Sequence, residues 1–144
     1  MTLRCRLPLL PALKRSHIDL GRKGEHLAAR YLSRRGYRLL GRNLHTAAGE
    51  ADLLCEDPHT GAIVLVEVKT RRRSTAQRGV YDPEHAVHVH KARRLLRIAR
   101  CLRKANNWQH RPFRIDVIAV DFVPNARKPI IRYHTNAVSA STPH

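Results

Sequence analysis

The run from Ala62 to Val68, Ala-Ile-Val-Leu-Val-Glu-Val, is the most apolar and β-branched stretch of the chain. A continuous run of this kind is typical of a strand that is covered on both faces, as the central strands of α/β sheets are. One acid, Glu67, interrupts it, and an unpaired carboxylate in such a place is costly. The run therefore predicts a central strand whose acid belongs to a functional site, with an incidental surface ion pair as the alternative.

The rest of the chain shows helical and strand periodicity on both sides of this strand. The predicted elements are helices over residues 16–35 and 83–105 and strands over 37–43, 50–56, 62–68, 113–122 and 130–134. Residues 70–79 have no apolar period, which predicts a mobile basic loop. This order of elements predicts an α/β fold, a mixed β-sheet flanked by helices.

The chain has 144 residues, which is the size of one ordinary domain. We expect that domain over residues 16–135, preceded by a poorly ordered basic extension over 1–15 and followed by a frayed tail over 136–144. The extension lacks the cleavage motif of a secretory signal, and no stretch approaches the ~20 apolar residues of a membrane span. The widely spaced cysteines favour a reducing cytoplasm over a disulfide framework.

The net charge of the chain indicates the class of molecule that it binds. Lysine and arginine number 28 against 11 aspartates and glutamates, which gives a formal net charge of +17. A field of this strength favours a polyanion. Nucleic acid is the first candidate and an anionic membrane surface is the second.

Two pairs of residues on neighbouring strands form the candidate site. Side chains two apart on a strand share a face, so Glu50 lies with Asp52, and Glu67 lies with Lys69. The turn at residues 57–61 is short enough to leave the two strands as antiparallel neighbours. Counting outward from that turn brings Asp52 opposite Glu67, within about one or two residues.

Paired carboxylates suit a hard divalent cation. Mg²⁺ prefers oxygen ligands and keeps several waters, so Asp52 and Glu67 can supply the protein's share of ligands for Mg²⁺ or Mn²⁺. Glu50 is a further ligand or a neighbour that pairs with an arginine. Lys69 would stand beside the ion, where an ammonium orients or helps to deprotonate a water and offsets charge on phosphate.

Other charged residues lie near this pattern. Glu25 falls on the flank of the apolar stripe of the first predicted helix, so this acid needs a partner. Asp116 interrupts a later strand and is expected to be a buried acid that pairs with arginine or accepts hydrogen bonds.

A basic run directly follows Lys69. Phosphate contact is the preferred interpretation of Arg71, Arg72 and Arg73, with a solvated charge run as the alternative. Lys91 follows several histidines that do not share one helical face. We therefore expect a solvated or phosphate-contacting surface around Lys91 rather than a zinc site.

Four ordered motifs carry a family resemblance. They are Gly21-Arg-Lys-Gly-Glu25, Gly49-Glu-Ala-Asp-Leu-Leu54, Val66-Glu-Val-Lys-Thr-Arg71 and Arg114-Ile-Asp-Val-Ile118. In these motifs the chain resembles the bacterial YraN-like proteins, over about residues 17–138. The resemblance implies the restriction-endonuclease-like fold of PD-(D/E)xK nucleases, near archaeal Holliday junction resolvases. Their sites combine a helix Glu, a strand Asp and a Glu-x-Lys strand, which implies catalytic roles for Glu25, Asp52, Glu67 and Lys69.

The function expected from these observations is that of a metal-dependent endonuclease-like protein that binds nucleic acid. DNA is favoured over RNA, and branched or structured DNA is the expected substrate. By analogy with junction resolvases, a homodimer is an open expectation. The alternative is a non-catalytic nucleic acid-binding or adaptor protein that retains the nuclease fold.

Overall fold

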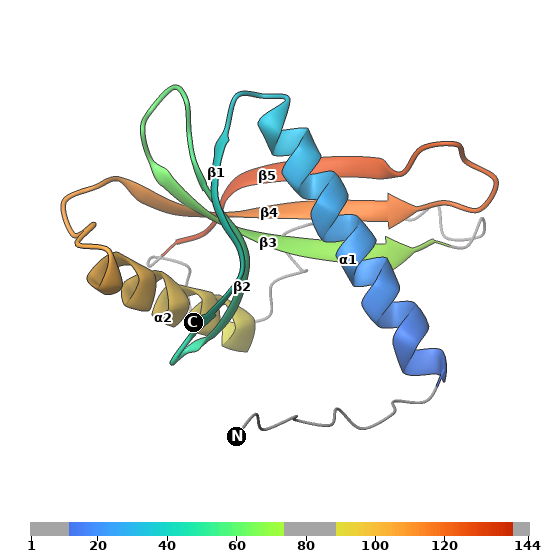
Figure 1. Cartoon of the computed structure of the whole chain (residues 1–144), viewed down its shortest axis with the longest axis horizontal. Coiled ribbons are helices and arrows are strands. Elements are labelled where there is room, and N and C mark those ends of the chain that lie inside the picture. The colour runs from blue at the N-terminus through green and yellow to red at the C-terminus, as the bar shows by residue number, and fades with distance from the viewer. Residues whose placement is uncertain (1–11, 74–88, 140–144) are drawn as a thin grey trace, which may run out of the picture.

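The computed structural model of the chain describes residues 12–73 and 89–139 (Figure 1). The elements in these ranges are α1 (Ala12–Ser33), β1 (Arg38–Thr46), β2 (Gly49–Glu56), β3 (Ile63–Arg72), α2 (Val89–Ala105), β4 (Phe113–Phe122) and β5 (Ile130–Val138). The five strands form one sheet in the order β1-β2-β3-β4-β5. Every neighbouring pair is antiparallel except β3 and β4, which run parallel. The predicted mixed sheet flanked by helices is therefore confirmed.

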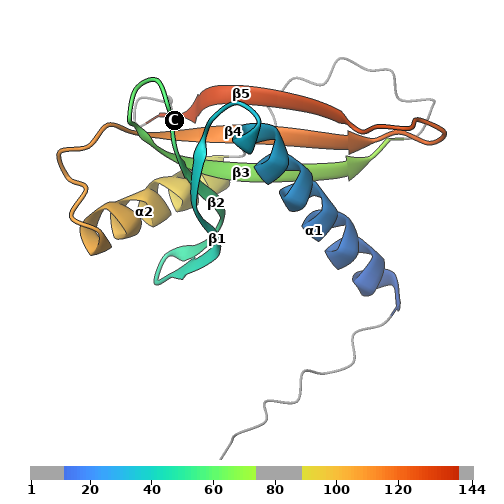
Figure 2. The same cartoon turned by 45° about the horizontal axis from the view of Figure 1, so that its top comes forward.

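The sheet is strongly twisted. Figures 1 and 2 both show β1 and β2 running steeply across the direction of β3, β4 and β5, as the right-handed twist of strands requires. The chain returns from the end of β3 to the start of β4 through a connection that contains α2, which the parallel pairing of these strands demands.

The apolar run at residues 62–68 forms the centre of the sheet, and its alternating side chains separate two cores. Ile63 and Leu65 pack in the cluster that includes α2, whereas Val64 and Val66 pack in the cluster that includes α1. All four side chains are fully buried. The two helices therefore cover opposite faces of β3, as the unbroken apolar sequence of this strand predicts.

A glycine brings α1 close to β3. Gly24, Ala28 and Leu32 are spaced by one helical turn and are all buried. A Cβ atom added at Gly24 would stand only 1.9 Å from the Oγ1 atom of Thr70, so the absence of a side chain sets the separation of helix and strand. Glu25, the next residue of α1, is held near the sheet as a result.

Two predicted boundaries differ from those of the structure. Helix α1 begins at Ala12 rather than at residue 16, and β3 continues to Arg72. Residues 70–72 were predicted to begin a mobile loop, but they pair with Val120–Phe122 of β4. The ladder with a neighbouring strand, which no local pattern reveals, keeps this basic segment extended. Residues 74–88, which include the predicted start of the second helix, lie outside the described part.

The last strand is longer than predicted. We expected β5 to end at residue 134 and a frayed tail from Asn136, but β5 continues to Val138. The backbone N–H of Asn136 donates a hydrogen bond of 2.8 Å to Oδ1 of Asp116, and Val138 is buried against the α2 side of the sheet. Contacts with β4 therefore order the segment that its polar sequence suggested was free.

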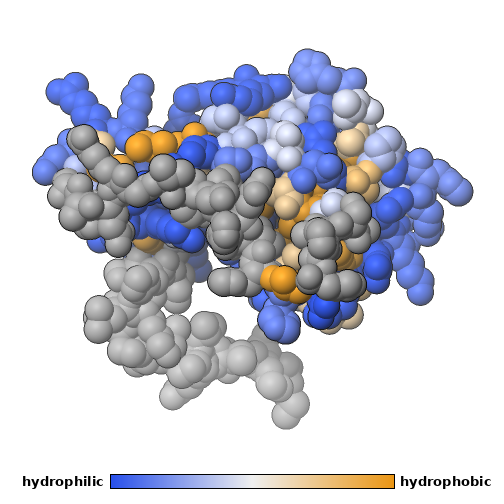
Figure 3. All heavy atoms as spheres, turned by 180° about the vertical axis from the view of Figure 1, so that it is seen from behind, coloured by the Kyte–Doolittle hydropathy of each residue, from blue (hydrophilic) through white to orange (hydrophobic). Residues whose placement is uncertain are grey.

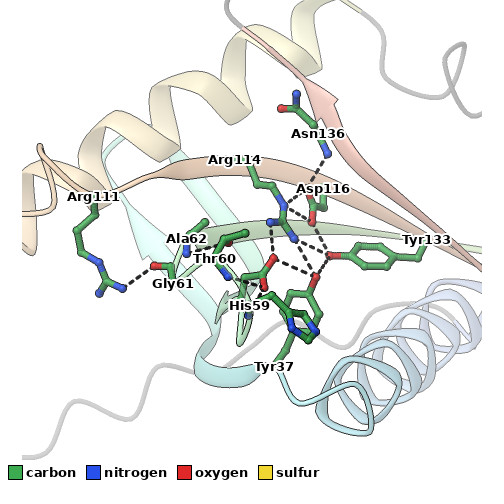
Figure 4. Close-up of polar contacts among 11 residues, drawn as sticks. Tyr37, His59, Thr60, Gly61, Ala62, Arg111, Arg114, Asp116, Tyr133 and Asn136 are labelled. Carbon is green, nitrogen blue, oxygen red and sulfur yellow. Dashed lines mark hydrogen bonds and ion pairs between the residues drawn. The ribbon is translucent and has the colours of Figure 1, made fainter.

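A buried polar network ties β4 to the α1 side of the fold (Figure 4). The Arg114 guanidinium donates to Asp57 at 2.6 Å, to Asp116 at 3.0 and 3.1 Å, and to the Tyr37 hydroxyl at 2.9 Å. The Tyr133 hydroxyl also donates to the Asp116 carboxylate. The prediction that Asp116 is a buried acid paired with arginine is confirmed, and its charge is compensated within the network.

A candidate metal and nucleic-acid site

The β2–β3 hairpin brings two of the predicted site acids together. Its register pairs Leu53 with Val66, and the next residues along the two strands are Asp52 and Glu67. Oδ2 of Asp52 accepts a hydrogen bond of 2.7 Å from the backbone N–H of Val68. This bond reaches across to β3 beyond the last recorded pair of the ladder, and it fixes the Asp52 side chain beside Glu67.

Glu67 lies between two ammonium groups. Its side chain is only 7% exposed, and its Oε1 forms a close ion pair with the Nζ atom of Lys91, from the first turn of α2. The Nζ atom of Lys69 stands 3.9 Å from the same oxygen. The predicted Glu-x-Lys pair is thus joined by a second lysine, which sequence analysis had assigned to phosphate contact.

The pKa values of these groups are shifted by burial and by the charges of their neighbours. Burial, then the charge of Glu67 and to a smaller extent that of Glu25 raise the pKa of Asp52 to about 7, against the opposing effect of the Val68 N–H. Burial and the charge of Lys91 lower the pKa of Lys69. Burial alone would lower the pKa of Lys91, but its contact with Glu67 outweighs burial and raises it. Glu25 therefore acts on Asp52 through its charge.

The donor set fits a hard divalent cation. Two carboxylates meet at one place, and their mutual repulsion would be relieved by a positive ion between them. Within residues 12–73 and 89–139 no group of three or more His, Cys, Asp and Glu side chains could hold a metal ion. Asp52 and Glu67 are a pair of carboxylates, and a pair can suit Mg²⁺ because this ion keeps several waters.

Glu50 is placed differently from its prediction. Its carboxylate forms an ion pair of 3.3 Å with Nδ1 of His45, and the two side chains are 67% and 76% exposed. Glu50 pairs with His45 in the β1–β2 ladder, whereas the recorded β2–β3 ladder begins only at Leu53, so Glu50 lies on the part of β2 beyond this pairing. The structure does not bring Glu50 to the carboxylate pair.

The three arginines after Lys69 divide into two kinds. Arg71 and Arg72 are exposed at the end of β3. The Nε atom of Arg73 instead stands 2.8 Å from Oδ2 of the buried Asp121, which also pairs with Arg132. Arg73 thus has a structural partner, and the expected phosphate contact is better placed at Arg71 and Arg72.

Further basic side chains surround the domain. Arg93, Arg97 and Arg100 are exposed on α2, which begins beside the carboxylate pair at Lys91. Figure 3 shows long hydrophilic side chains projecting from the described part of the molecule.

Along the described ranges, neither helix is long and apolar enough to cross a bilayer. Cys55 and Cys101 carry free thiols, and Cys5 lies outside those ranges.

Comparison with known families gives one clear match. The family model for the uncharacterised protein family UPF0102 matches residues 24–120. A UPF0102 protein of Anaeromyxobacter dehalogenans is 43% identical over 103 residues, which cover 72% of each chain. One of Clavibacter michiganensis is 45% identical over 102 residues, covering 71% of this chain and 81% of the relative.

Other relatives are longer than the matched region. A UPF0102 protein of Oleidesulfovibrio alaskensis is 38% identical over 114 residues, which cover 79% of this chain but 54% of the relative. The chain therefore spans about half the length of that relative.

Two solved structures share part of the fold. An EndoMS–dsDNA complex has 23% identity and a TM-score of 0.34, covering 55% of this chain and 26% of that one. A repair endonuclease from Pyrococcus abyssi has 15% identity and a TM-score of 0.42, covering 69% and 38%. Both likenesses concern the fold over part of each chain, and neither bears on the site.

Proposed function

The chain belongs to the uncharacterised protein family UPF0102, and we propose that it is a metal-dependent nuclease that binds DNA and hydrolyses its phosphodiester bonds. The observation that supports this most strongly is the meeting of Asp52 and Glu67 in a largely buried place beside Lys69. An acid on a protein surface is solvated by water, so it needs neither a second acid nor a lysine beside it. One half-buried and one buried carboxylate with a flanking lysine form a site that favours a cation and a phosphate.

Asp52 and Glu67 are the residues that would hold Mg²⁺ or Mn²⁺. When bound, such an ion stabilises charge on a phosphate and lowers the pKa of a water. The hydrogen bond from Val68 occupies Oδ2 of Asp52 and holds the carboxylate in place. This arrangement orients the ligand before any ion arrives, which reduces the reorganisation that binding requires.

The two lysines divide the remaining tasks. Lys69 has a lowered pKa because of burial and the nearby Lys91, so it loses a proton more readily than a free lysine and can assist a water nucleophile. The pKa of Lys91 is raised, so Lys91 holds its proton more strongly, and its positive charge compensates the negative charge of Glu67. Glu25 adds negative charge near Asp52 and supports cation binding from α1.

The exposed arginines supply affinity for the substrate. Arg71 and Arg72 at the end of β3, together with Arg97 on α2, are exposed and would contact phosphates of the bound DNA. Such contacts depend on charge rather than on base sequence, and they weaken as salt is raised. We expect a nuclease that recognises the shape of its DNA, with branched or structured DNA as its substrate.

Cleavage assays with two matched variants test this proposal. We would incubate the protein with branched, flapped, single-stranded and duplex DNAs in Mg²⁺, Mn²⁺ or EDTA. Asp52→Asn keeps an oxygen that can accept from Val68 but removes the charge, and Lys69→Met removes the ammonium with little change in length. Each should lower the cleavage rate by about 10²-fold or more.

The matched control is Glu50→Gln, which removes one carboxylate charge on the same strand as Asp52 but at an exposed position. Its rate should remain within about twofold of the unaltered protein, because a surface ion pair contributes little. Metal-dependent cleavage that persists unchanged in both Asp52→Asn and Lys69→Met would overturn the assignment of the site.

A second candidate function is a non-catalytic DNA-binding protein that retains the nuclease fold. The ion pair between Lys91 and Glu67 favours it, because this contact already compensates one of the two proposed ligands. This candidate predicts salt-sensitive binding in EDTA and no cleavage with either metal. The same assays therefore distinguish the two functions.

A further inference from the structure

A basic hollow lies beside α1, away from the carboxylate pair. It has a volume of about 440 Å³ and opens between the second half of α1 and the connection from β4 to β5. Five cations line it, Arg30, Arg34, Arg35, Arg127 and Lys128. Leu27, which also lines it, is two residues from Glu25, or about 200° around the helix. The hollow and the acid thus lie on opposite flanks of α1.

No carboxylate within the described ranges balances these five charges. Nine ion pairs are recorded there, and none involves any of the five. Among the residues that the structure describes, no acidic side chain lines the hollow either. Like charges gathered around one concavity repel each other and attract an anion into it. The positive potential of the hollow therefore favours the binding of a negatively charged ligand.

Part of this surface is already ordered. The Arg35 guanidinium lies 3.5 Å from the centre of the Tyr31 ring, and its Nη1 donates to the Tyr31 carbonyl oxygen at 3.4 Å. The Tyr31 ring in turn meets the Tyr133 ring edge to face, with centroids 6.0 Å apart. A stacked guanidinium offers a flat cationic surface, which suits both phosphates and nucleic acid bases.

Helix capping explains only some of the cations. Basic side chains in the last turn of a helix complement its dipole, which accounts for Arg30 near the end of α1. Arg127 and Lys128 come from the β4–β5 connection and have no such role. Their convergence on the helix end across an apolar floor that includes Leu27 and Ile131 indicates a binding surface.

We propose that this hollow binds one nucleotide of a single-stranded nucleic acid segment, with the phosphate held by the cations and the base against the apolar floor. Its volume lies in the range of roughly 300–1,000 Å³ that is usual for pockets that take small molecules. A nucleotide from a single strand can enter such a concavity, whereas bases within a duplex are stacked away from it. Resting on the proposed function, this inference adds a preference for DNA with a single-stranded branch.

Binding measurements in EDTA test the hollow without requiring cleavage. Fluorescence anisotropy would compare a labelled single-stranded oligonucleotide with a blunt duplex of the same length. The test variant is Arg34→Gln/Lys128→Gln. Its control, Arg42→Gln/Lys104→Gln, removes one arginine and one lysine at exposed positions elsewhere.

The test variant should bind the single strand about tenfold more weakly than the control does at moderate salt. Its slope of log affinity against log salt should fall by about 0.7, because the hollow holds one phosphate and each phosphate contact of a single strand contributes ~0.7. Affinity for the duplex should match that of the control. Urea unfolding of both variants checks that the fold is retained.

Equal loss of single-strand affinity in the test and control variants would overturn the proposal, because only total charge would then matter. So would an equal loss for single strand and duplex. A loss confined to binding of anionic phospholipid vesicles would identify a membrane surface as the ligand instead. Since EDTA removes metal-dependent cleavage from the measurement, failure here leaves the proposed nuclease activity standing, and failure of cleavage leaves this test intact.

Discussion

The ion pair between Lys91 and Glu67 predicts how stability depends on a divalent cation. Lys91→Met removes the ammonium and keeps most of the aliphatic chain, so Glu67 loses its close partner. Among the described residues, Lys69, with its Nζ atom 3.9 Å away, would remain to compensate the Glu67 carboxylate. The variant should unfold more easily than the unaltered protein in EDTA.

The exposure of the two side chains sets the magnitude. Removing one partner of a fully buried ion pair costs about 3–5 kcal/mol, whereas an exposed pair contributes about 0–1 kcal/mol. Glu67 is 7% exposed and Lys91 is 37% exposed, so this pair lies between the two cases. We expect a loss of about 2 kcal/mol in the free energy of unfolding, or a fall of about 6 °C in Tm for a domain of this size.

Urea unfolding followed by circular dichroism, in EDTA and in Mg²⁺, measures this loss. A cation that binds only the folded state at a hundred times its Kd stabilises that state by about 2.7 kcal/mol. In the unaltered protein the ion competes with Lys91 for Glu67, and in the variant it does not. Mg²⁺ should therefore stabilise Lys91→Met more than the unaltered protein.

Lys104→Met is the matched control, since Lys104 is exposed near the end of the same helix. The reasoning is refuted if Lys91→Met and Lys104→Met unfold at the same urea concentration in EDTA. It is also refuted if Mg²⁺ stabilises the Lys91 variant and the unaltered protein equally, because Lys91 would then not compete for the ligand.

Two further predictions concern the fold. Gly24→Ala should lower the free energy of unfolding by about 1–3 kcal/mol because its Cβ would clash with Thr70, whereas Gly21→Ala, with open space around it, should raise it by about 0.5–1 kcal/mol. Urea midpoints decide this, and equal shifts would contradict the close approach. Burial alone would raise the pKa of Asp57, but hydrogen bonds from Arg114 and two backbone N–H groups lower it to about 2. Because this folded pKa lies below the unfolded value of about 3.9, the stabilisation is complete above about pH 5 and is lost as pH falls towards 2. Asp57→Asn should therefore show a flatter dependence of urea midpoint on pH in that range, and parallel curves would disprove the link.

The parts of the fold that follow from local patterns were predicted well. The bounds of β4, Phe113–Phe122, coincide with the predicted strand, because its apolar sequence is confined between polar connections. The approach of Asp52 to Glu67 could also be predicted from the sequence, since a short turn joins their strands and the register follows by counting. Both inferences depend on neighbours in the sequence.

The differences arise where distant segments meet. Thr70–Arg72 remain in β3 because β4 pairs with them, and Val138 is ordered because it packs on the far side of the sheet. Lys91 reaches Glu67 only after the crossover has placed α2, so its spacing from Glu67 in the chain gives no signal. Glu50 was predicted to join Asp52 because residues two apart on a strand share a face, but Glu50 lies beyond the part of β2 that pairs with β3.

The parallel pairing of β3 with β4 also implies an order in which the segments fold, because β4 can pair with β3 only after the long crossover has formed. The β2–β3 hairpin is a local structure, and local contacts form earlier than those that must close a long loop. During synthesis the segment that carries Asp52 and Glu67 emerges before α2 and β4 exist to cover it. The newly formed hairpin thus presents both acids to water, where their repulsion is weakest. Lys91 arrives later, with the crossover, and compensates Glu67 as that face of the sheet is buried.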